Sequence, residues 1–161
     1  LGRSMGIPAE AMLPEKTSKR PLSIFDFPIK DFETFVASKL LGDLAEILQV
    51  EDLLHCSFVP LRNLVRSIMP EEKFHQQYGV DFGKEVVKSA DGRARLQAGV
   101  DAFFPVILNF FGRPGSKNNE IYRRWGIKIR TNEAMRDDYI VRAKAACEEV
   151  GVTPPPVPAV H

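Results

Sequence analysis

The sequence predicts an all-α protein, a bundle of helices with proline-rich segments at both ends. Over long stretches the apolar residues recur at alternating intervals of three and four, the spacing of a helix with one buried face. No stretch shows the regular apolar–polar alternation of a half-buried strand. Prolines and glycines cluster around the periodic stretches, where they begin or end helices. The length of 161 residues suits one domain of ordinary size.

The chain divides into three parts. Residues 1–30 contain four prolines and a basic run at 16–20, which predicts an irregular arm without a core of its own. Residues 31–151 form the helical bundle, and residues 152–161 form a proline-rich tail that proline geometry keeps extended. The sequence opens on Leu1 rather than Met, so we expect it to be a piece of a longer chain.

Two long helices are predicted first. The helix over residues 31–54 has a buried stripe made of Phe32, Val36, Leu40, Ile47, Val50 and Leu54. The helix over residues 61–89 has a stripe made of Leu61, Val65, Ile68, Phe82 and Val86. Pro60 suits its first turn, whereas Pro70 removes a backbone donor from its interior and predicts a kink or a local bulge.

Three more helices follow. One begins after Asp91 and Gly92 and runs to Phe111, with Pro105 interrupting it. A short helix over residues 119–129 holds the single tryptophan, Trp125. The last helix is predicted to begin at an N-cap, Thr131, and to end near residue 150 before Gly151.

Composition excludes several classes of protein. The 22 basic residues balance 21 acidic ones, so a net charge of +1 gives no electrostatic case for binding nucleic acid or an anionic membrane surface. The two cysteines lie far apart and form no CxxC pair, which excludes a disulfide scaffold and a zinc ribbon. No apolar run reaches the ~18–20 residues of a membrane span and no signal peptide is evident, so we expect a cytoplasmic protein.

Polar residues interrupt the apolar stripes at three positions. Asp43 occupies a core position of the first helix, and Glu72 and His75 occupy successive core positions of the second. A lone buried carboxylate costs several kcal/mol unless it is paired or binds a cation. Glu72 and His75 are spaced i, i+3 on one helix face, and bundle di-iron sites use this unit twice, with one carboxylate from each of two other helices. The chain therefore carries half of such a constellation, with Glu46 placed to orient a ligand; a chance surface pair remains the alternative.

Several segments resemble one known family. The motifs are SIFDFP at residues 23–28, EEKFHQQ at 71–77, Phe104-Pro105 followed by Phe111-Gly112, and WGIKIRTNE at 125–133. They are similar to the phenylacetic acid catabolic proteins, whose catalytic subunits are ferritin-like di-iron enzymes. The resemblance implies that Asp43, Glu72 and His75 are iron ligands. It also implies an oxidoreductase, a monooxygenase that uses O2 to epoxidise the aromatic ring of phenylacetyl-CoA or a related aryl-CoA thioester.

The resemblance also implies partners. A structural subunit of the same fold accompanies the catalytic one, and a separate iron–sulfur flavin reductase supplies electrons. Gln49, Lys128, Arg130 and Asn132 are candidates for contacting the CoA phosphates, with a solvated basic face as the alternative. The ligand set suits manganese as well as iron.

One departure from the family matters for function. The family's other single carboxylate and other ExxH lie on two helices that precede the matched region, so the resemblance predicts a ferritin-like bundle lacking its first two helices. The missing ligands would come from an absent N-terminal half, a partner chain or a second copy. The alternatives are a degenerate relative without metal, a non-catalytic structural subunit of the same complex, and a plain helical bundle.

Overall fold

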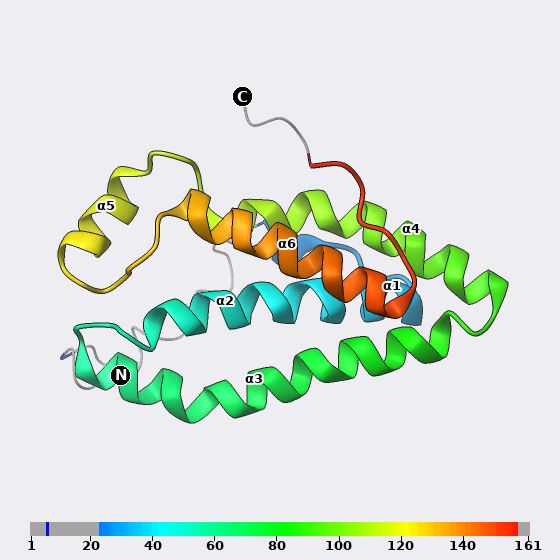
Figure 1. The fold of residues 1–161 in the computed structure, drawn as a ribbon, viewed down its shortest axis with the longest axis horizontal. Coiled ribbons are helices and arrows are strands. Elements are labelled where there is room, and N and C mark those ends of the chain that lie inside the picture. The colour runs from blue at the N-terminus through cyan, green and yellow to red at the C-terminus, as the bar shows by residue number, and fades with distance from the viewer. Residues whose placement is uncertain (1–5, 7–22, 158–161) are drawn as a thin grey trace.

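The computed structural model describes residue 6 and residues 23–157, which fold into helices joined by short loops (Figure 1). Most of the predicted arm, including its basic run at 16–20, and the end of the predicted tail lie outside the described residues. Within the described ranges no strand is present. The predicted all-α bundle is confirmed, consistent with a ferritin-like arrangement.

The first predicted helix forms as one continuous run with an irregular centre. It comprises α1 (Phe32–Ser38), a π-helical segment (Lys39–Asp43) and α2 (Leu44–Leu53). The run begins where the Asp31 carboxylate accepts a hydrogen bond of 2.7 Å from the amide of Thr34. The π segment is a departure from the prediction, which placed a bulge at Pro70 and none here.

The next two long helices run in opposite directions (Figure 1). A short 3-10 turn (Ser23–Asp26) precedes the bundle, and α3 (Val59–Val86) carries Pro60 in its first turn. Figure 1 shows α3 bending in its N-terminal half, which contains Pro70. Helix α4 (Ala90–Ile107) continues through Pro105 and gives way to a 3-10 turn (Leu108–Phe111) that begins three residues after this proline.

The last two helices differ in how closely they match their predicted bounds. Helix α5 (Lys117–Arg124) is shorter than predicted and leaves Trp125 at its C-cap with its side chain exposed. Helix α6 (Asn132–Val150) begins at Thr131, whose hydroxyl accepts from the amide of Ala134 at 3.1 Å. It ends at Gly151, which adopts a left-handed φ of 92°, so both predicted boundaries of this helix are confirmed.

A single core lies between α1, α2, α4 and α6, with α3 packed on the π segment and α2. Phe32 and Phe82, predicted to be buried, are instead 52% and 39% exposed and contact one another with ring centroids 5.8 Å apart. The core itself is contributed by the following buried residues: Val36, Ala37, Leu40, Leu41, Leu44, Ala45, Leu48, Val80, Leu96, Val100, Phe103, Phe104, Ile107, Leu108, Phe111, Met135, Tyr139, Ala143, Ala146, Cys147, Val150 and Val152.

The described part of the tail is fastened to α4. The side-chain amide of Gln97 donates to the carbonyl of Thr153 at 2.6 Å and accepts from its amide at 2.9 Å. Helix α5 lies at one end of the bundle in Figure 1, and no residue between 112 and 131 belongs to the buried apolar core. Among the described residues, no helix combines the length and apolar character needed to cross a membrane.

Candidate metal centre

Asp43 stands at the C-terminal end of the π segment, pointing into the protein. Its residue exposure is only 7%, as the sequence pattern predicted. The ammonium of Lys39, one turn earlier, lies 2.9 Å from Oδ1 and 2.6 Å from Oδ2. This partly buried ion pair offsets the charge of the carboxylate and fixes its orientation.

Glu72 lies on α3, which packs against the π segment that carries Asp43. The residue is half-buried, and its Oε2 atom is buried without a hydrogen-bond partner. A buried carboxylate oxygen without a donor costs free energy, and a proton or a bound cation would relieve that cost. This oxygen is therefore the best indication of a missing positive charge at the site.

Glu46 lies one turn beyond Asp43 and is influenced by the charges of both Asp43 and Glu72. The residue is exposed at its surface, but partial burial of its carboxyl group raises the pKa of Glu46, and the carboxylates of Asp43 and Glu72 raise that pKa further. Both neighbours lie within electrostatic reach of Glu46, so the three residues form an acidic cluster between α3 and the start of α2, although they lack the mutual spacing of metal ligands. Such a cluster repels itself unless it holds protons or a cation.

His75 does not belong to this acidic cluster. Its side chain is partly exposed, and Nε2 lies 4.0 Å from Oε1 of Glu71, one turn earlier on the exposed side of α3. Among the residues that the structure describes, no three His, Cys, Asp or Glu side chains are placed together so that they could hold a metal ion. The candidate donors therefore match a metal centre only in part: carboxylate oxygens come from two helices, and the imidazole of His75 lies one turn away.

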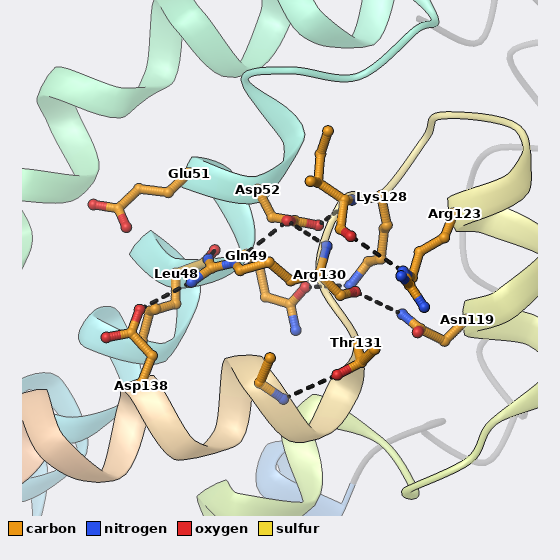
Figure 2. A network of polar contacts seen from close by, with 12 residues as sticks. Leu48, Gln49, Glu51, Asp52, Asn119, Arg123, Lys128, Arg130, Thr131 and Asp138 are labelled. Atoms are coloured by element: carbon orange, nitrogen blue, oxygen red, sulfur yellow. Dashed lines mark hydrogen bonds and ion pairs between the residues drawn. The ribbon is translucent and has the colours of Figure 1, made fainter.

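A second polar cluster surrounds Asp52, near the end of α2 (Figure 2). Asp52 is 3% exposed, and its carboxylate accepts hydrogen bonds from the amides of Ile129 and Arg130 at 3.2 and 3.0 Å. The Nε of Arg130 adds a contact of 3.4 Å. One buried carboxylate thus ties the segment before α6 to the end of α2.

Three of the four residues predicted to contact CoA belong to this second cluster. The ammonium of Lys128 donates to Oε1 of Gln49 at 2.5 Å. Burial and the charge of Arg130 lower the pKa of Lys128, whereas the charge of Asp52 raises it. The guanidinium of Arg130 donates to Asp138 and to the carbonyl of Leu48, each at 2.9 Å. Each of these two basic side chains thus makes at least one hydrogen bond within the fold.

The fourth predicted residue lies elsewhere. Asn132 is buried at the start of α6, and its side-chain amide donates to the carbonyl of Arg113 at 2.9 Å. It closes the loop between the 3-10 turn and α5, and it shares no hydrogen bond with Lys128 or Arg130.

Sequence reasoning missed Asp52. A signal for it was present, because Leu41, Ala45 and Leu48 form a second buried row on the first helical run and Asp52 continues that row. Asp138 was also missed; it pairs with Arg142 of the next turn through bonds of 3.0 Å. Both acids serve the attachment of α6 and its preceding segment.

Comparison with known proteins identifies the family. The sequence profile of the family described as "Phenylacetic acid catabolic protein" matches residues 9–161. The chain belongs to this family. It is also 27% identical over 137 residues to one of the subunits of the 1,2-phenylacetyl-CoA epoxidase of Escherichia coli (strain K12). That alignment covers 83% of this chain but 44% of the relative, so the chain spans less than half of that protein's length.

Membership of the phenylacetic acid catabolic protein family confirms the resemblance drawn from the sequence motifs. The motif at residues 71–77 lies on α3 and supplies Glu72 and His75. The motif at residues 125–133 forms the segment held by Asp52. The motif at residues 71–77 therefore contributes Glu72 to the acidic cluster. The motif at residues 125–133 contains the segment that joins α6 to the end of α2.

Proposed function

We propose that this chain is part of a monooxygenase subunit that epoxidises the aromatic ring of phenylacetyl-CoA or a related aryl-CoA thioester. The single observation that carries the proposal is the buried Oε2 of Glu72, which lacks a hydrogen-bond partner and faces a cluster containing Asp43 and Glu46. The family match and the similarity to an epoxidase component supply the reaction class.

Asp43, Glu72 and His75 would hold iron, as half of a two-iron site. With iron bound, the site would supply the activation of O2 that ring epoxidation requires. Lys39 compensates the charge of Asp43, and Glu46 lies where its carboxyl group can orient a ligand or hold a proton. No observation supports manganese, so the proposal is confined to iron.

The remaining ligands would come from residues outside this sequence or from a second copy of the chain. A structural subunit of the same fold and an iron–sulfur flavin reductase would complete the enzyme. For the CoA moiety, Lys128 is the strongest of the four predicted contacts, because its ammonium donates to Gln49 with one N–H and carries two further N–H donors. Arg130 and Asn132 support the site by holding the segment in place.

Iron binding tests this proposal directly. The purified chain would be loaded anaerobically with Fe(II), and bound iron would be measured by mass spectrometry of the metal. Glu72→Gln and His75→Ala should lose most of the bound iron, while Glu85→Gln and His55→Ala, which remove exposed groups of the same kind, should retain it. Equal iron in all four variants would contradict the proposed ligands.

A second candidate function is a structural subunit that binds no metal. The observation in its favour is that no three metal-ligating side chains come together among the described residues. In that case the wild-type chain takes up no iron, alone or with partner subunits, yet forms a stable complex with them. Iron analysis of the isolated chain and of the assembled complex separates the two candidates.

A further inference from the structure

The π segment (Lys39–Asp43) changes the direction of the side chains that follow it. A π turn inserts one extra residue into an α-helix, which rotates everything after it by about 100° relative to an uninterrupted helix. It also forces backbone groups out of their regular pairing, so short π segments persist only where the surroundings favour them. Asp43 is the last residue of this segment, so its position depends directly on it.

Tyr139 of α6 bonds to this segment from one side. Its phenolic hydroxyl donates to the carbonyl of Leu41, the third residue of the π segment, at 3.1 Å. The side chain is fully buried, and its ring lies against Phe104 and Phe111, with centroids 6.2 and 5.0 Å away. These neighbours hold the ring, so the hydroxyl remains directed at Leu41.

Gly79 of α3 meets the same segment from another side. A Cβ atom at this position would lie 2.7 Å from the amide nitrogen of Leu40 and 2.8 Å from its Cα. The backbones of α3 and the π segment therefore touch directly, which leaves the segment little room to move. Tyr139 and Gly79 together confine it between two helices.

We propose that Tyr139 is a positioning residue for Asp43. Its hydrogen bond to Leu41 stabilises the π segment, and the π segment sets the direction of the buried Asp43 carboxylate. Without the bond, the segment gains freedom to return to regular α-helical pairing, which would turn Asp43 away from the acidic cluster. The role in iron binding rests on the proposed function, whereas the hold on the π segment does not.

The test compares Tyr139→Phe with Ile107→Val. Both variants trim a fully buried side chain, but only Tyr139→Phe removes a hydrogen bond to the π segment. In the metal-free protein, amide hydrogen exchange over residues 41–46 should rise about fivefold to tenfold in Tyr139→Phe beyond the change in Ile107→Val, after correction for global stability. Equal exchange in the two variants would overturn the proposal.

Iron affinity supplies the second measurement. If the wild-type chain binds Fe(II), Tyr139→Phe should weaken binding by a similar factor, and Ile107→Val should leave it unchanged. Faster exchange with unaltered affinity would refute the positioning role. If the wild-type chain binds no Fe(II) either alone or with partner subunits, the proposed function fails, and hydrogen exchange alone decides whether Tyr139 holds the segment.

Discussion

The carboxylate of Asp52 accepts a hydrogen bond from the backbone amide of Arg130, 78 residues further along the chain, at 3.0 Å. Asp52 ends a buried row of α2, and Arg130 precedes the N-cap of α6. The contact joins two parts of the structure that the sequence pattern left unconnected. It therefore holds the segment that precedes α6 against the end of α2.

Replacing Asp52 should show how much this contact contributes to the free energy of unfolding. Asp52→Ala leaves two backbone amides and a partly buried guanidinium without their acceptor, so we expect a loss of about 3–5 kcal/mol in unfolding free energy. Glu51→Gln is the matched control, since it breaks a more exposed pair with Arg142 and should cost ~1 kcal/mol or less. Urea denaturation measures both. Similar small losses would show that Asp52 contributes no more than a surface pair.

The contact between α3 and the π segment predicts opposite outcomes at two glycines. Gly79→Ala places a methyl group 2.7 Å from the backbone of Leu40 and should destabilise the protein by about 1–3 kcal/mol or more. At Gly42 the added carbon would lie 3.7 Å from the ring of Phe103, an ordinary contact, so Gly42→Ala should be neutral or stabilising by about 0.5–1 kcal/mol. Thermal denaturation of both variants checks the prediction. A tolerated Gly79→Ala would argue against direct backbone contact.

The raised pKa of Glu46 predicts how stability depends on pH. Folding favours the protonated form, so the contribution of Glu46 is present below its ordinary pKa of 4.5 and is lost as pH rises through the raised value. In the metal-free protein, Glu46→Gln should therefore be more stable than wild type at pH 7, by a few tenths to about 1 kcal/mol given solvent screening.

The pH series supplies the control for this effect. The advantage of Glu46→Gln should shrink toward zero below pH 4.5, and Glu85→Gln, on the exposed side of α3, should show no such trend. Denaturation at several pH values with the metal removed measures the difference. A constant advantage across the pH range would mean that charge at Glu46 is not the cause.

The two cysteines should be unreactive in the folded protein. Cys56 and Cys147 are both free and fully buried, and burial raises the pKa of the Cys147 thiol to about 12. A thiol-specific reagent at pH 8 should therefore label neither residue until denaturant is added, when both should react. Rapid labelling of either cysteine under native conditions would reveal local opening of the core.

Much of the fold followed from periodicity and from the residues at helix ends. The cap at Thr131 and the stop at Gly151 were predictable because their local chemistry is decisive. The exposure of Phe32 was not, because a stripe residue at the first turn of a helix is buried only if another element covers it. The π segment was also unpredictable, since it depends on contacts from Tyr139 and Gly79 that are remote in sequence.

The candidate site was predictable to a similar extent. A carboxylate in an apolar stripe is a strong local signal, and Asp43 is buried as expected. The position of His75 depends on what covers the outer side of α3, which periodicity does not encode. Lys128 and Arg130 illustrate another limit, because basic side chains suited to phosphates are equally suited to acceptors within the fold, here Gln49 for Lys128 and Asp52 for Arg130.

The attachment of α5 has a consequence for cooperativity. Residues 112–130 join the bundle through hydrogen bonds, such as those from Ser57 to Gly126 and Trp125, rather than through the apolar core. Releasing them exposes little apolar surface, so the free energy of this opening should depend only weakly on denaturant. We therefore expect residues 112–130 to open as a subglobal unfolding unit, whose detachment would leave the rest of the bundle folded and expose the end of α2.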